Sequence, residues 1–403
     1  MLRHPAFAAE VTREQLVDWF RTARARTREL FAIIKPEAYY DRPIALRNPI
    51  VFYEGHLPVF SVNTLVKLAL QKPGLNPEFE KLFERGIDPD SEAAVTNKNA
   101  GWPDREAVQA YGREADALVE ELLRTADLCD DDVPCLRGGE AVFTILEHEL
   151  MHQETLLYML HNLPQRLKVG TASAPLRRGG GVTPGTVTIP PGIATLGAER
   201  TTFGWDNEFP AHETHVDEFT IDTHNVTNGE WLEYMRATGA AAPHFWEWVD
   251  GTWYWRGMFA SIPLPHDWPV YVTHEQAAAY ARWKGRRLPT EAEWHRAAEG
   301  APIGHADFAS LDPVPAGSHA PSAWGVHDLT GNGWEWTSTP FRPFDGFQPM
   351  PSYALYSTDF FVDAHYVLKG ASPVTAKQLI RPSFRNWFRP NYPFVYATFR
   401  TVR

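Results

Sequence analysis

Two histidines four residues apart, His148 and His152, stand in the apolar segment AVFTILEHELMHQETLLYML. This segment is typical of one long helix, and residues four apart on a helix lie one turn from each other on the same face. Two imidazoles in that arrangement can bind a single metal ion. The sequence therefore predicts a metal site on this helix.

A third histidine, His56, is the best candidate for a further ligand to that metal. It lies in the apolar segment FYEGHLPVF, where burial of an unpaired imidazole would be costly. A lone histidine in such a setting is more often a hydrogen-bonded core residue, but the other two histidines favour metal binding. Three neutral imidazoles leave several coordination positions open, which suits Fe(II) that binds substrate and dioxygen, or zinc that holds water. The spacing alone does not separate these metals.

The same residues contain the pattern His-Glu-x-x-His, which is also the signature of zinc proteases. In such an enzyme Glu149 would act as the general base, but a third ligand is needed downstream. The nearest histidine, His161, follows His152 by nine residues and lacks the usual glycine-bearing turn, which disfavours a protease. A buried histidine pair without metal is another alternative. Glu154 would point about 200° from His152 around the helix, so we expect it to support the site rather than bind the metal.

Four segments show helical patterns and could position these histidines. Thr12 and Gln15 form a capping box at the start of the first segment, residues 11–31. The other three segments cover residues 48–70, 104–126 and 141–160. Four helices with long connections indicate a bundle with at least one crossover, and such bundles bind metals through inward-facing side chains.

The second half of the chain has a different character. Thirteen of the 15 tryptophans follow residue 170, and PLRRGGGVTPG, residues 175–185, is typical of a linker. Short strand-like segments then alternate with short helices, which begin at three capping boxes: Thr227 with Glu230, Thr273 with Gln276, and Thr290 with Glu293. The sequence thus predicts a multidomain α and α+β protein. A helical bundle over residues 1–174 carries the metal site, and an irregular α+β domain covers residues 186–403.

The composition narrows the function classes. A net charge of -12 and a pI near 5.7 argue against nucleic acid or an anionic membrane as a partner. The two cysteines, Cys129 and Cys135, indicate no disulfide framework, which fits a reducing cytoplasm. The first residues form no apolar signal-peptide core, and there is no run of about 18 apolar residues to span a membrane. We therefore expect a cytoplasmic protein.

Four segments of the second half resemble the formylglycine-generating-enzyme fold, a C-type-lectin-like α+β domain. They are residues 206–231, GRRLPTEAEWHRAA (285–298), DLTGNGWEWTSTPF (328–341) and residues 381–403. The first half resembles the DinB-like four-helix bundle. The two together, with His-x-x-x-His-x-Glu on the bundle, resemble the sulfoxide synthases of the ergothioneine and ovothiol pathways, that is, the ergothioneine/selenoneine synthase family.

This resemblance implies an enzyme with a defined cofactor and substrates. Family members bind Fe(II) through three histidines, which match His56, His148 and His152, and use O2 to join a chalcogen to the imidazole of a histidine derivative such as hercynine. The C-terminal domain would supply substrate-binding loops, and structural Ca2+ is a further ion to consider there. Formylglycine generation itself is disfavoured, because it needs a cysteine pair in that domain and residues 136–403 contain no cysteine.

The resemblance also assigns roles around the reaction. The family's active-site tyrosine, an acid or proton-coupled donor, matches Tyr353 or Tyr356 in PMPSYALYSTDFF, and we favour Tyr353. Asn386 and Trp387 match residues that hold the trimethylammonium group of hercynine, and an indole face attracts a quaternary ammonium. For these aromatic side chains, ordinary packing is the alternative.

Three departures from the family pattern bear on the second substrate. Enzymes that use γ-glutamylcysteine carry an Arg-x-x-x-x-Arg-Pro segment whose arginines clamp the donor's carboxylates. Here TNKNAGWPDREAV offers only Lys98 before Pro103. Phe388 replaces an acid that would hold the donor's ammonium group, and Met151 replaces a glutamine of the bundle. We therefore expect a donor other than γ-glutamylcysteine.

One branch of the family, the selenoneine synthases, takes a neutral selenosugar, which needs no arginine clamp. We favour that branch, which implies a functional link to a selenosugar synthase. Three alternatives stay open. They are an ergothioneine-type sulfoxide synthase that uses cysteine or γ-glutamylcysteine, a zinc-dependent thiol transferase that needs no oxygen, and a non-catalytic binding protein related to sugar-binding modules.

Overall fold

The computed structural model describes residues 1–84, 101–170 and 183–403 and divides the chain into two compact units. Unit 1 consists of Met1–Gly170 with two short pieces, Thr201–Phe203 and Met350–Ala354, and unit 2 holds the rest. The predicted fold class is confirmed, because unit 1 is helical and unit 2 mixes helices with small sheets. Lys98 and most of the predicted linker lie outside the described residues, so the linker's boundaries stay a prediction.

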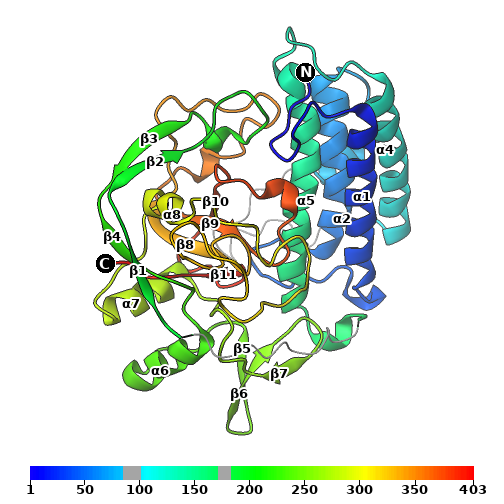
Figure 1. Cartoon of the computed structure of the whole chain (residues 1–403). Coiled ribbons are helices and arrows are strands. Elements are labelled where there is room, and N and C mark those ends of the chain that lie inside the picture. The colour runs from blue at the N-terminus through cyan, green and yellow to red at the C-terminus, as the bar shows by residue number, and fades with distance from the viewer. Residues whose placement is uncertain (85–100, 171–182) are drawn as a thin grey trace. The chain divides into compact units, whose positions relative to one another are not determined.

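Unit 1 is built around four long helices, and all four predicted helices are present (Figure 1). They are α1 (Arg13–Ala32), α2 (Ile50–Ser61), α4 (Arg105–Thr125) and α5 (Glu140–Asn162). Helices α1 and α2 each contact both α4 and α5, so the four surround a common core. A short helix, α3 (Pro77–Leu82), was not predicted; the side chain of Asn76 caps it. Shorter 3-10 turns occupy Pro36–Ala38, Pro134–Gly139 and Gln165–Leu167.

Local sequence explains the ends and the irregularity of these helices. Thr12 and Gln15 form the predicted capping box of α1. The predicted second helix runs on past Ser61, but its continuation, Val62–Ala69, is a π-helix rather than an α-helix. Pro58 lies inside α2 and has no N–H to donate to the preceding turn. Helix α2 is apolar on all sides and almost wholly buried, as expected for a helix in the core of a bundle.

Unit 2 contains four small sheets within its described residues. Two are antiparallel pairs, β1 (Thr186–Ile189) with β4 (Phe219–Asp222) and β2 (Gly192–Leu196) with β3 (His212–Val216). A third is the antiparallel meander β5 (Trp246–Val249), β6 (Thr252–Arg256) and β7 (Ser261–Pro263). The fourth has the order β10 (Asn386–Phe388), β9 (Tyr366–Ala371), β8 (Gly333–Pro340), β11 (Ala397–Thr398), and β11 runs parallel to β8.

Three α-helices accompany these sheets: α6 (Asn228–Thr238), α7 (His274–Trp283) and α8 (Glu291–Ala297). Each begins at a predicted capping box, and all three boxes are confirmed in both directions. Further 3-10 turns lie at Asp206–Glu208, Thr358–Phe360 and Lys377–Leu379.

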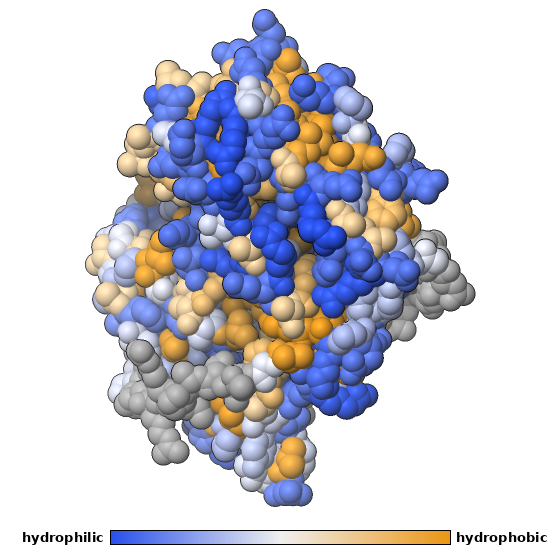
Figure 2. Space-filling view, turned by 90° about the vertical axis from the view of Figure 1, so that its right-hand side faces the viewer, coloured by the Kyte–Doolittle hydropathy of each residue, from blue (hydrophilic) through white to orange (hydrophobic). Residues whose placement is uncertain are grey.

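On the molecular face shown in Figure 2, hydrophilic and hydrophobic residues are intermixed. None of the described helices is both long and apolar enough to cross a membrane.

A fully buried ion pair joins the central strand β8 to the end of the chain in unit 2. The Arg400 guanidinium donates two hydrogen bonds to the Glu335 carboxylate, at 2.8 and 2.6 Å, and neither side chain is exposed. Asn225 also donates to Glu335, and Arg400 donates to the main-chain carbonyls of Asp222 and His327. Every charge is therefore matched, which is the condition under which a buried pair is tolerated.

Glu335→Gln should destabilise unit 2, because it leaves the Arg400 charge buried without a full counter-charge. We expect a loss of about 3 kcal/mol in the free energy of unfolding. Tryptophan fluorescence during urea denaturation would measure it, since the described tryptophans after residue 170 lie in unit 2. Asp363→Asn, which breaks an exposed pair with Arg342, is the control and should change nothing measurable. Equal midpoints for the two variants would contradict this account.

Candidate metal centre

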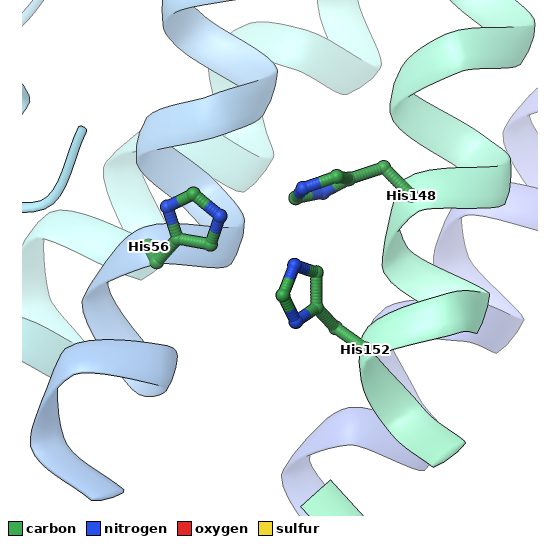
Figure 3. Close-up of side chains that lie close together, drawn as sticks. All are labelled: His56, His148 and His152. Atoms are coloured by element: carbon green, nitrogen blue, oxygen red, sulfur yellow. The ribbon is translucent and has the colours of Figure 1, made fainter. Parts of the chain in front are cut away.

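The three predicted metal ligands meet between two helices of unit 1. His56 projects from α2, and His148 and His152 project from α5 one turn apart (Figure 3). Each offers one ring nitrogen, and these atoms all lie within 4.8 Å of one another. Within the described ranges, this is the one group of three or more His, Cys, Asp or Glu side chains with such spacing. The structure thus brings together the residues that the sequence singled out.

Neighbouring groups fix the orientation of two of the rings. Nδ1 of His56 lies 2.8 Å from the carbonyl oxygen of Phe83. Because a carbonyl only accepts, this nitrogen carries the proton, and Nε2 keeps its lone pair for a metal. His148 stacks on Phe60, with ring centroids 3.5 Å apart and 10° between the planes. The two rings are therefore held in place by the protein alone.

Burial keeps the imidazoles in the form that binds metal. It lowers the pKa of His148 and of His152 well below the usual range, and neighbouring imidazoles lower it further. Their lone pairs are therefore available at neutral pH. Nδ1 of His152 is buried and has no hydrogen-bond partner among the described residues, which costs free energy unless another group satisfies it. Three neutral imidazoles fit a divalent transition metal such as iron or zinc.

Glu149 would be the general base if the protein were a zinc protease, but its carboxylate binds residues of α1 instead. Its carboxylate accepts hydrogen bonds from Arg24 and Thr27 of α1 and is buried. It does not belong to the metal-binding group, and neither does His161, the nearest downstream histidine. A protease would therefore lack its base, and the described residues supply no downstream third ligand. Glu154 is buried on α5 and lies outside the group as well.

The two candidate tyrosines fall in different units. Tyr353 belongs to the piece Met350–Ala354 of unit 1, where its ring centroid lies 5.2 Å from that of Phe60 and 6.3 Å from that of His148. Tyr356 belongs to unit 2 and stacks on Trp205 at 4.0 Å. Although these tyrosines are only three residues apart in sequence, they fall in different units, and within unit 1 Tyr353 lies close to the His148 ring.

The piece that carries Tyr353 is anchored to α5 through Ser352. The Ser352 hydroxyl lies 2.9 Å from that of Thr144, and its backbone N–H donates to Glu140 at 2.8 Å. Both hydroxyls are buried. Thr144 lies four residues before His148, so the anchor and the ligand share one face of α5.

The predicted hercynine residues lie on β10 of unit 2 in aromatic surroundings. One face of Trp387 stacks on Phe341, with centroids 4.2 Å apart and planes 8° apart, and Tyr356 and Phe360 also contact the indole. The Asn386 side chain accepts a hydrogen bond from the backbone N–H of Trp387. A quaternary ammonium would therefore meet the side of the indole that Phe341 does not cover.

Phe388 and Met151, the two residues that replace polar residues of the family pattern, have apolar side chains. Phe388 stacks on Tyr392, with centroids 5.1 Å apart, so this position supplies an aromatic ring where an acid would hold an ammonium group. Met151 lies half-buried on α5, directly before His152. Neither can form an ion pair with a charged donor.

Two residues that position the ligands were not predicted. Phe60 follows His56 by four residues on a helix, so its spacing could have indicated a contact with the site. Phe83 acts through its main-chain carbonyl, and its residue type therefore carried no signal.

Comparisons with known proteins agree with both units. The description "Sulfatase-modifying factor enzyme 1-like domain" fits residues 174–403, and "DinB superfamily" fits residues 20–156. These assignments match the motifs of the second half and the helical pattern of the first.

Relatives that match nearly the whole chain are named hercynine oxygenase or ergothioneine biosynthesis protein 1. The chain is 32% identical to hercynine oxygenase of Mycolicibacterium smegmatis over 430 residues, which cover 94% of this chain and 96% of the relative. It is 31% identical to hercynine oxygenase of Mycolicibacterium thermoresistibile over 443 residues, covering 97% and 94%. Ergothioneine biosynthesis protein 1 of Schizosaccharomyces pombe is 28% identical over 92% of this chain, which spans 54% of that longer protein. The chain therefore belongs to the ergothioneine-synthase-like family that includes the hercynine oxygenases, with a DinB-type bundle followed by a sulfatase-modifying-factor-type domain.

Proposed function

We propose that this protein is a non-haem Fe(II) enzyme that uses dioxygen to join a chalcogen atom to the imidazole ring of hercynine. The observation that carries the proposal is the group of three imidazoles, two buried and one half-buried, in a chain that matches hercynine oxygenases along nearly its whole length. We infer the substrate, hercynine, from the names of these relatives, and we infer the metal from the chemistry of the three ligands.

His56, His148 and His152 would hold the iron, and three protein ligands leave positions open for other molecules. Bound Fe(II) supplies the activation of dioxygen. The electrons balance with one O2. Joining the ring carbon to sulfur or selenium, with loss of a C–H and an S–H or Se–H bond, removes two electrons, and oxidation of the chalcogen to the oxide removes two more. One oxygen atom then enters the product and the other leaves as water.

The remaining assignments concern binding and proton transfer. Asn386 and Trp387 are proposed to bind the trimethylammonium group of hercynine. Tyr353, whose ring is 6.3 Å from that of His148, is proposed to donate a proton from Oη during bond formation, with Tyr356 as the alternative. Structural Ca2+ in unit 2, a cytoplasmic location and a functional link to a selenosugar synthase stay predictions.

A neutral selenosugar is our proposed chalcogen donor, which makes the protein selenoneine-synthase-like. Phe388 and Met151 support this choice, because neither offers a charge to a dipeptide and Phe388 packs on another ring. A stacked aromatic pair is also a suitable surface for a sugar. The alternative is an ergothioneine-type sulfoxide synthase that takes cysteine or γ-glutamylcysteine through other groups.

A competition assay in air would test both the reaction and the donor. Fe(II)-loaded protein would receive hercynine with equal amounts of a selenosugar and γ-glutamylcysteine, and mass spectrometry would identify the products. We expect a selenium adduct of hercynine to dominate. A sulfoxide adduct of the dipeptide would overturn the donor assignment but keep the reaction class. No hercynine adduct with either donor would overturn the proposed function.

Tyr353→Phe should divert turnover from hercynine to simple oxidation of the donor, because it removes the proposed proton donor. We expect the rate of adduct formation to fall about 100-fold or more, while donor oxidation continues. Tyr40→Phe, at an exposed tyrosine of unit 1, is the matched control and should keep the normal product ratio. If Tyr356→Phe shows the diversion and Tyr353→Phe does not, our choice between the two tyrosines is wrong.

A further inference from the structure

Each of the three histidines is followed directly by a residue that binds the same turn of α1. The followers are Leu57, Glu149 and Gln153, and their partners are Ala23, Arg24 and Thr27. Two of the followers act through side chains and Leu57 acts through its carbonyl. We call Ala23, Arg24 and Thr27 the α1 patch.

Arg24 is the centre of the α1 patch and joins it to three other helices. Its Nη2 donates to the carbonyl of Leu57 at 3.2 Å and to the hydroxyl of Ser61 at 2.9 Å, both on α2. Its Nη1 donates to Glu149 on α5 at 2.5 Å, and its Nε lies 2.9 Å from Asp116 on α4. The side chain is only 6% exposed. One guanidinium thus fixes α2 and α5, the two helices that carry the ligands, relative to each other.

Thr27 and Gln153 complete the connection to α5. The Gln153 side chain is fully buried and donates to the carbonyl of Ala23 at 2.9 Å and to the Thr27 hydroxyl at 3.1 Å. The Thr27 hydroxyl in turn donates to Glu149. The residues after both α5 ligands are therefore bound to α1 within one turn of each other.

This network favours the observed arrangement of the helices. Its members are buried, so breaking one contact leaves a polar group or a charge unsatisfied. Rotating α5 about its axis would move Glu149 and Gln153 away from α1 at the same time. Because each follower is covalently next to a ligand, the same constraint sets the distance and direction of the three imidazoles. Metal affinity depends strongly on such supporting contacts.

We propose that the α1 patch is the positioning element of the metal centre: it holds the three histidines in ligand geometry before any metal binds. This inference rests on the proposed metal site, but not on hercynine or on the donor. The proposal also explains the pattern His-Glu-x-x-His-Gln without a zinc protease. Glu149 and Gln153 are positioning residues that face α1, and none of the patch residues would touch the metal.

Co(II) titration of the metal-free full-length protein tests the proposal, since the visible absorption of Co(II) reports both affinity and coordination geometry. Glu149→Gln and Arg24→Lys should weaken Co(II) binding about 10- to 100-fold and alter the absorption bands. Arg24→Lys keeps the charge but loses the planar fork that reaches α2 and α5 together. Thr27→Val should weaken binding in the same direction, and Thr27→Ser, which keeps the hydroxyl, should restore it.

Glu147→Gln is the matched control for general damage. Glu147 is buried on α5 directly before His148, but its carboxylate accepts from His4 rather than from the α1 patch. It should lower stability while leaving the Co(II) affinity and spectrum unchanged. All titrations would be made where circular dichroism shows the variants folded. If Arg24→Lys does not fold, Glu149→Gln and the two Thr27 variants carry the test.

The outcomes separate the two claims. Failure of the wild-type protein to bind Co(II) would overturn the metal site itself. Wild-type binding with affinities and spectra unchanged in folded Glu149→Gln and Thr27→Val would overturn the positioning role alone. Equal weakening in Glu147→Gln would also overturn it, because the loss would then follow stability and not the α1 patch.

Discussion

The constraint on unit 1 is a group of three imidazoles, two buried and one half-buried, whose ligand nitrogens lie within 4.8 Å of one another. Such a group is stable only if the rings stay neutral and their inward nitrogens are satisfied. The surroundings meet the first requirement through burial, which lowers the pKa of His148 and of His152. A bound cation would meet the second. The apolar helix α2, the buried helix α5 and the polar contacts behind them all serve to hold this otherwise costly arrangement.

Much of this organisation could be predicted from the sequence, because its causes are local. Capping boxes such as that of Thr12 set helix starts, and the four-residue spacing of His148 and His152 follows from helix geometry alone. What escaped prediction depends on tertiary contacts. The carbonyl of Phe83 has no sequence signature, and nothing local separates Tyr353 from Tyr356. A piece of chain beyond residue 349 joins unit 1, which no pattern in the first half could indicate.

The His-Glu-x-x-His pattern illustrates how one sequence supports two chemistries. In a zinc protease its glutamate faces the metal-bound water, whereas here the Glu149 carboxylate accepts hydrogen bonds from Arg24 and Thr27 of α1. The pattern defines which residues share a helix, and the packing of neighbouring helices decides which of them face the metal. In the proposed donor site, Phe388 and its stacking partner Tyr392 would give an apolar surface, and the proposal therefore assigns donor selectivity to shape and stacking rather than to charge pairing.

Dioxygen uptake by the protein loaded with Fe(II), and separately with Zn(II), tests the central claim most directly. The account predicts uptake by the iron form only when hercynine and a chalcogen donor are both present, in step with the adduct, and none by the zinc form. Transfer of a thiol by the zinc form to a substrate that carries a leaving group, without oxygen, would contradict it and favour a thiol transferase. Uptake by the iron form that yields no hercynine adduct would contradict it as well.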